Sequence, residues 1–154
     1  PERLRVSVEF DQASGDAPGG RFGRFDTLFG MRRADLSPAG LYAAIGRANI
    51  ATPGIRFEIA PGPAWDGLAV YRAMWLDEPT DSFSTTGVRD PSGAAGRFAG
   101  HQLEGRVRWW LVRNRLRAEV NAVWLAKGRF FERAPNASAN GDTVYVSTAL
   151  SFSL

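Results

Sequence analysis

Apolar and polar residues alternate along several segments of this chain, and this pattern constrains the fold more than any other feature of the sequence. Between residues 3 and 11 every odd position is polar or charged and every even position is apolar. Successive side chains of an extended strand point to opposite faces of a sheet. The pattern therefore predicts a β-strand with one apolar and one polar face.

The same pattern predicts five further strands. They lie at residues 55–60, 65–75, 101–111, 115–126 and 143–154. The segment 101–111 alternates most regularly, whereas 65–75 is less regular and is assigned with its tryptophans on the apolar face. The Pro-Gly-Pro sequence at 61–63 and the pair Arg113-Asn114 are typical of turns that end strands. We predict an all-β chain of about six antiparallel strands.

The links between these strands alternate in length. Long links at about 12–53, 77–100 and 128–142 are separated by short ones at 61–64 and 113–114. Outer-membrane β-barrels have short periplasmic turns and longer external loops, whereas a soluble β-sandwich has no reason to sort its loops in this way. We therefore expect a single domain, residues 1–154, that forms part of a transmembrane β-barrel with the three long links as external loops.

Hydropathy taken alone would suggest a soluble protein rather than a membrane protein. The chain has no apolar run of the roughly 18 residues that a membrane-spanning helix requires, and its mean hydropathy is slightly negative. Strands that span a membrane alternate lipid-facing and lumen-facing residues, so their average hydropathy lies near zero. A soluble antiparallel sandwich produces the same alternation and stays open as an alternative. The sorting of the loops and the positions of the tryptophans favour the barrel.

Four of the five tryptophans lie near the ends of predicted strands. With a periplasmic C-terminus, Trp65 and Trp109 fall near the periplasmic end of the barrel, and Trp75 and Trp124 near the outer end. At roughly 3.3 Å per residue and a 45° tilt, the distance from Trp65 to Trp75 projects to about 23 Å, close to the apolar band of such barrels. We predict a membrane-interface girdle in contact with outer-membrane lipid, made by Trp65, Trp75, Trp109, Trp124 and Phe152.

The polar faces of the predicted strands carry more arginines than acids. Eight arginines oppose six acidic residues there, and eight minus six leaves an excess of two, concentrated beside Arg113-Asn114. Guanidinium groups stay charged and suit carboxylates, and rings of arginine select anions in pores. The predicted lumen residues are Arg5, Arg56, Arg72, Gln102, Glu104, Arg106, Arg108, Arg115, Arg117 and Glu119.

Ion pairing within the wall is the alternative role of these residues. A cross-strand pair contributes about 0.2–1 kcal/mol without any substrate. The interspersed acids Glu58, Glu104 and Glu119 could also orient the arginines and keep a polymer from binding too tightly, because transport requires weak and distributed binding. We state this role of the acids as a hypothesis.

Residue types that serve enzymes and metal sites are scarce. The chain has no cysteine and one histidine, His101, with no serine nucleophile motif beside it. We therefore expect no enzyme activity, no metal site and no cofactor. The basic and aromatic run at 106–117 could suit single-stranded nucleic acid, but its alternation favours a barrel wall and no nucleic-acid partner.

In the first long link, Ser37-Pro38 predicts the start of a short helix that folds over or into the pore.

Several segments in loops and at strand starts are distinctive. They are 25–30 (FDTLFG), 46–50 (GRANI), 87–93 (GVRDPSG), 96–104 (GRFAGHQLE), and 134–136 (APN) followed by 141–143 (GDT). Together they resemble the C-terminal part of the alginate export family of outer-membrane porins, over essentially all of the chain from Phe25 onward. The chain departs from the usual pattern of outer-membrane barrels at Leu154, where such chains commonly end in Phe.

The resemblance implies an eighteen-stranded barrel that carries a linear anionic polysaccharide out of the periplasm through an arginine-lined lumen. Six strands are too few to enclose a useful pore, so we expect the other strands to precede Pro1. The predicted function is an outer-membrane channel for export of an alginate-like uronate polymer, with periplasmic export partners as a further expectation. The alternative is a general or anion-selective nutrient porin with no polymer specificity.

Overall fold

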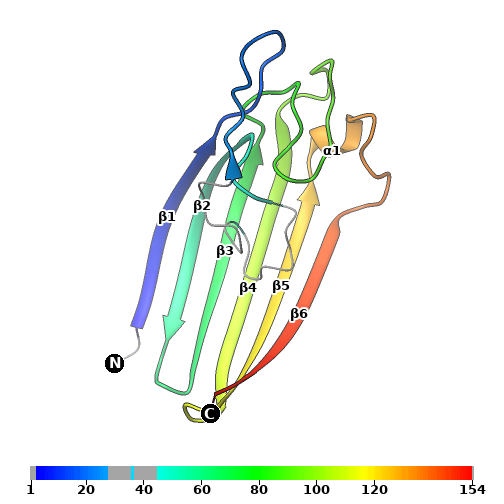
Figure 1. Ribbon diagram of the computed structural model, residues 1–154. Coiled ribbons are helices and arrows are strands. Elements are labelled where there is room, and N and C mark those ends of the chain that lie inside the picture. The colour runs from blue at the N-terminus through cyan, green and yellow to red at the C-terminus, as the bar shows by residue number, and fades with distance from the viewer. Residues whose placement is uncertain (1–2, 28–35, 37–44, 154) are drawn as a thin grey trace.

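The protein folds into one six-stranded antiparallel sheet. The structure is a computed structural model that describes residues 3–27, 36 and 45–153. Its strands are β1 (Arg3–Ala13), β2 (Ile50–Ala60), β3 (Trp65–Trp75), β4 (Phe98–Val112), β5 (Leu116–Lys127) and β6 (Thr143–Phe152). Strands that are consecutive in the chain are neighbours in the sheet, which makes an up-and-down meander (Figure 1). The all-β antiparallel prediction is confirmed.

The sheet is open within the described residues. Its edge strands, β1 and β6, each pair with a single neighbour. An open meander of this kind is consistent with a segment of a larger barrel wall, because a closed barrel would pair its first and last strands. No described helix is long and apolar enough to cross a membrane.

Some strands extend beyond their predicted ends. β3 coincides with its prediction, but β2 starts at Ile50 and β4 at Phe98. Pro53 and Gly54 interrupt the alternation in β2, yet the backbone pairing with β1 continues past them. Pairing depends on the backbone, so a break in side-chain pattern does not end a strand. The short helix α1 (Arg129–Arg133) was not predicted.

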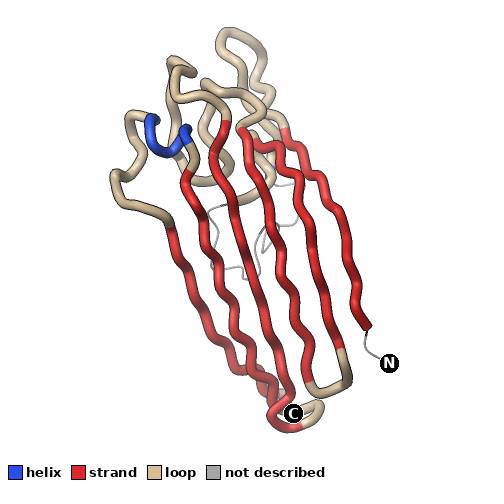
Figure 2. The backbone as a smooth tube through the Cα atoms, turned by 180° about the vertical axis from the view of Figure 1, so that it is seen from behind, coloured by secondary structure: helices blue, strands red, loops and turns tan. Residues whose placement is uncertain are grey.

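The connections are sorted by length between the two ends of the sheet (Figure 2). Short turns at 61–64 and 113–115 lie at one end, here called the turn end, together with the start of β1 and the end of β6 (Figure 1). The described parts of link 14–49, together with links 76–97 and 128–142, lie at the other end, here called the loop end. The start of the short helix predicted at Ser37-Pro38 lies outside the described residues.

One face of the sheet, here called the outer face, is apolar and bare. It carries exposed large side chains from every strand, and Val8 on β1 is 86% exposed. Soluble monomers rarely leave so extended an apolar surface uncovered. Among the described residues no second sheet covers it, which is the opposite of a soluble sandwich. The exposed outer-face residues include Leu4, Val6, Val8, Phe10, Phe57, Tyr71, Leu103, Val107, Trp124, Val146 and Leu150.

The other face, here called the inner face, carries an apolar core only near the loop end. Met74, Val123 and Leu125 point inward from the strands and pack with residues of the long links. Phe83 meets Phe131 of α1 with ring centroids 5.5 Å apart. Apolar burial of this kind stabilises packed elements by about 25 cal/mol per Å². The long links are therefore fixed onto the loop-end part of the inner face.

Candidate functional site

The inner face brings together nearly all of the predicted lumen residues. The strand register pairs Arg5 with Glu58, Arg72 with Gln102, and Arg108 with Glu119, and residues that pair directly share a face. Arg115 is the exception, which corrects its predicted place on a strand. It lies in the turn 113–115 and is exposed, because Asn114 adopts a φ of 59° and β5 begins only at Leu116.

A cluster of charged residues occupies the middle of the inner face. Arg72 lies at its centre and is 1% exposed. Its Nη2 donates to Glu9 Oε2 at 2.9 Å, and further contacts reach Asp11 Oδ2 at 3.6 Å and Glu104 Oε1 at 3.8 Å. Arg56 Nε donates to the other oxygen of Glu9 at 2.6 Å. Mutual neutralisation of these charges makes their burial possible.

Gly54 makes room for the buried arginine. It pairs with Arg72 across β2 and β3, and a Cβ at this position would lie 3.2 Å from Arg72 Cγ and 3.0 Å from the Tyr71 carbonyl oxygen. The absence of a side chain lets Arg72 lie flat across β2 and reach Glu9 on β1. The glycine that breaks the alternation of β2 therefore serves the central cluster.

The first long link is attached to this part of the wall. Gln102 Nε2 donates to the backbone carbonyl of Leu36 at 2.8 Å and to Glu104 Oε2 at 3.2 Å. Arg47 pairs with Asp11 at 2.9 Å. Gln102 is fully buried and Glu104 is 3% exposed. Three of the residues predicted to line the lumen, Arg72, Gln102 and Glu104, are therefore on the inner face but covered.

The turn-end half of the inner face is more open and less neutralised. We use this name for Asp66, Arg106, Arg108, Trp110, Arg117, Glu119 and Asn121. Arg108 Nε donates to both carboxylate oxygens of Asp66, at 2.9 and 3.2 Å, and Nη2 lies 2.9 Å from Oδ1, so its charge is matched. Arg106 and Arg117 have no carboxylate within 4.0 Å among the described residues, and the Nε of each is buried without a hydrogen-bond partner. A groove of about 360 Å³ runs past Arg5, Arg106 and Arg108.

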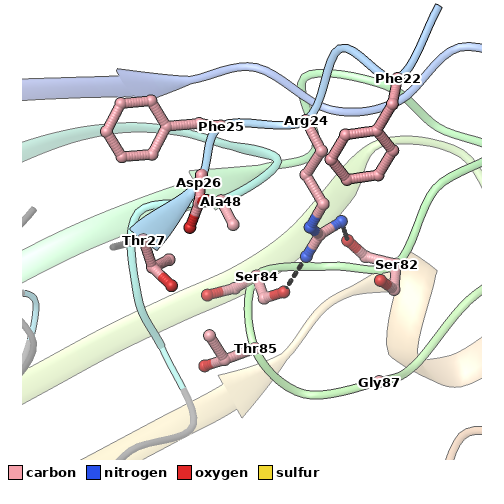
Figure 3. A pocket seen from close by; sticks show the side chains of 10 residues that line it. All are labelled: Phe22, Arg24, Phe25, Asp26, Thr27, Ala48, Ser82, Ser84, Thr85 and Gly87. Carbon is pink, nitrogen blue, oxygen red and sulfur yellow. Dashed lines mark hydrogen bonds between the residues drawn. The ribbon is translucent and has the colours of Figure 1, made fainter. Parts of the chain in front are cut away.

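A second hollow of about 590 Å³ lies between the long links at the loop end (Figure 3). Arg24 points into it from the first link, but its guanidinium donates to Asp81 and to the carbonyls of Ser82 and Ser84. Those contacts occupy the donors of the Arg24 guanidinium and neutralise its charge, so neither is left for an anionic ligand. The hollow is thus a junction between loops, and the unmatched arginines lie at the turn end.

The carboxylate of Asp81 holds this junction together. Burial raises the pKa of Asp81, but hydrogen bonds from the N–H groups of Asp16 and Ser82 and the charge of Arg24 outweigh that effect and keep the pKa below its ordinary value of 3.8. A carboxyl with a lowered folded-state pKa contributes stability that is complete above the ordinary value. That stability is lost as the pH falls through the lowered value.

We therefore expect the rate of amide hydrogen exchange in residues 14–27 and 76–97 to stay constant from pH 7 to pH 4. The rate is corrected for the intrinsic pH dependence of exchange. It should rise only below about pH 3.8, the ordinary value for Asp81. Asp81→Asn should exchange faster already at pH 7 and should show a smaller rise on acidification, the remainder coming from Asp90, whose pKa is also lowered by its hydrogen bonds. Identical exchange in the two proteins across the range would show that Asp81 does not hold the loops.

The aromatic residues predicted to form a girdle all lie on the outer face. Trp65 and Trp109 pair directly near the turn end, and Phe152 pairs with Leu116 at the same end. Near the loop end, Trp75 meets Phe98 with centroids 5.3 Å apart. Trp124 Nε1 donates to Asp142 Oδ2 at 3.2 Å.

Sequence reasoning missed the partner of the single histidine. The Tyr71 hydroxyl lies 2.7 Å from His101 Nδ1, and the two rings stack on the outer face. Tyr71 and His101 are far apart in sequence, and only the pairing of β3 with β4 places them at neighbouring positions.

An antiparallel meander with a bare apolar face, a charged face and its long loops at one end has the architecture of an outer-membrane β-barrel wall. The family model for alginate export matches residues 3–145, nearly the whole chain. The chain therefore belongs to the alginate export family, a family of outer-membrane porins and not of enzymes, and the predicted resemblance is confirmed. No curated protein matches the chain.

Proposed function

We propose that this chain forms part of the wall of an outer-membrane channel that exports an anionic, alginate-like polysaccharide. Family membership supports a polysaccharide export channel. The observation that carries the finer proposal is the pair of unmatched arginines, Arg106 and Arg117, on the open turn-end half of the inner face. Their guanidinium groups keep their charge at all physiological pH values and present planar donors to carboxylates.

The proposed orientation places the turn end in the periplasm and the loop end outside the cell. Short turns and long loops follow this rule in outer-membrane barrels. The paired Trp65 and Trp109 would then lie at the periplasmic interface, and Trp75 and Trp124 at the outer one. A polymer arriving from the periplasm, with or without export partners there, meets the turn-end half first.

The two halves of the inner face have different roles in this proposal. The central cluster around Arg72 is neutralised and covered, so it holds the wall and the first long link in place. The turn-end half attracts the polymer with a small number of positive groups. Binding stays weak because matched pairs such as Asp66–Arg108 separate the unmatched arginines, which suits a conduit that must also release its cargo.

A general or anion-selective nutrient porin is the second candidate function. The same unmatched arginines support it, because small anions respond to a positive wall as a polymer does. The two functions differ in how long a polymer of several acidic sugars stays on the wall. One variant removes an arginine that has no carboxylate partner, and a second removes an arginine that is already paired with a carboxylate. Both lose the same charge, so a difference between them identifies direct contact with the polymer.

We expect Arg106→Gln to shorten the residence of an oligouronate in the pore about tenfold, as the loss of one charge-assisted contact implies. Arg108→Gln is the matched control. It removes the same charge from the next inward position of β4, but that charge is already paired with Asp66, so we expect at most about a twofold change. For both variants of the full-length protein, the residence of the oligouronate is measured as the dwell time of current blockades in planar bilayers.

Equal shortening in the two variants would show that only net charge matters and would favour the anion-selective porin. A wild-type current that oligouronate does not block would contradict the polymer channel itself.

A further inference from the structure

Trp110 is the one tryptophan of the chain that the strand register places on the inner face. It pairs with Arg117 across β4 and β5, whereas the other four tryptophans lie on the outer face. Arg117 Cζ lies 5.7 Å from the centroid of the Trp110 ring. A guanidinium at this distance is attracted electrostatically by the negative face of the ring. The indole therefore holds Arg117 in a defined position on the wall.

Three polar groups on the turn-end half are incompletely satisfied. The Nε atoms of Arg106 and Arg117 and the Oδ1 of Asn121 are buried, and none has a hydrogen-bond partner among the described residues. The other buried atoms without a partner belong to Thr52, Arg72 and Gln102, nearer the loop end. Buried polar groups in folded proteins nearly always have a partner, so three orphan groups on adjacent strands indicate that water or a ligand completes them. Two of the three are cationic donors, which favours an anionic ligand.

The spacing favours a polymer over a single ion. Arg106 and Trp110 are four residues apart on the same face of β4, which is about 13 Å along the strand. Arg108 lies between them and is neutralised by Asp66. The turn-end half therefore presents two separate positive positions with a neutral one between them, an arrangement that a chain carrying repeated carboxylates can bridge.

We infer that Trp110, Arg117 and Arg106 form a subsite for acidic sugars at the turn end. The Trp110–Arg117 stack offers a flat surface to the C–H face of a sugar ring, and the free edge of the Arg117 guanidinium donates to the carboxylate of that sugar. Arg106 takes a second carboxylate further along the polymer. This subsite rests on the proposed function and names the contacts by which the wall distinguishes acidic saccharides from inorganic anions.

The test compares Trp110→Leu, Trp110→Phe and wild type in the full-length protein in planar bilayers, with oligouronate as the polymer probe and chloride as the small-anion probe. We expect Trp110→Leu to shorten oligouronate blockades about five- to tenfold, because both the stacking surface and the position of Arg117 are lost. The chloride-to-potassium permeability ratio should stay unchanged, since no charge is removed. Trp110→Phe should recover most of the blockade time.

Arg117→Lys provides a second variant that keeps the charge but lacks the planar group. It should shorten oligouronate blockades to a similar extent while leaving the chloride selectivity intact. Blockades of wild-type length in both Trp110→Leu and Arg117→Lys would overturn the subsite. Failure of the proposed function is a separate result, because in that case wild type itself would show no blockade.

Discussion

Arg72→Met is expected to destabilise the wall by about 3–5 kcal/mol. Methionine fills a similar volume but removes the cation that Glu9, Asp11 and Glu104 share. Arg56 and Arg47 still pair with Glu9 and Asp11, but the buried Glu104 loses its cationic partner, and removal of one member of a buried ion cluster is strongly destabilising. Arg72 is almost fully buried and contacts all three acids. Unfolding by urea of the detergent-solubilised or vesicle-inserted protein measures the change.

Arg5→Met is the matched control for this variant. Arg5 also lies on the inner face and pairs with Glu58, but at 3.6 Å and with its side chain 76% exposed. Exposed pairs of this kind contribute little, so we expect a change below about 1 kcal/mol. If Arg72→Met were no more destabilising than Arg5→Met, the central cluster would not hold the wall together.

The second large effect is expected at Gly100, where substitution by alanine should prevent assembly of the sheet or destabilise it by more than about 4 kcal/mol. Gly100 has a φ of +140°, and a Cβ there would lie 2.1 Å from the carbonyl oxygen of Ala126 on the adjacent strand and 2.8 Å from the backbone nitrogen of Gly128. Backbone atoms cannot move aside as a flexible side chain can. The fraction of protein that folds into detergent micelles or vesicles measures the effect.

Gly105→Ala on the same strand is the control for Gly100→Ala. The nearest atom to a Cβ at Gly105 is the Leu68 carbonyl oxygen at 3.7 Å, an ordinary contact. We expect this variant to assemble as wild type does. Normal assembly of Gly100→Ala would show that β4 does not approach the end of β5 as closely as these distances require.

The sheet was predictable because its determinants are local. Alternation in segments such as 3–11 and 101–111 specifies which side chains share a face, and one buried or lipid-covered face then fixes the register. The same alternation predicts that Arg106, Arg108 and Trp110 share the polar face of their strand. The predicted faces of these strands agree with the observed pairing.

The burial of part of the predicted lumen was not predictable in this way. Gln102 meets the Leu36 carbonyl across 66 positions of sequence, and no periodic pattern specifies the path of so long a link. The exposure of an inward-facing residue depends on that path as well as on its own strand. Arg115 was misplaced for a simpler reason, because the left-handed conformation of Asn114 lengthens the turn by one residue.

The inner face therefore has two parts. Near the loop end the long links are anchored on it, and near the turn end it is accessible. In the anchored region, charge is matched and apolar residues of the long links pack against the strands. In the accessible region, Arg106 and Arg117 remain unmatched among the described residues. The proposed selectivity for acidic polymers thus depends on the turn-end half of the wall.

The most direct test of this account compares blockade of the wild-type, full-length channel by an oligouronate and by a neutral oligosaccharide of the same length. Both probes are added on the side of the turn end in a planar bilayer under a salt gradient. We expect an anion-selective current that the oligouronate interrupts with long blockades and the neutral sugar does not. Equal blockade by both probes, or a cation-selective current, would contradict it.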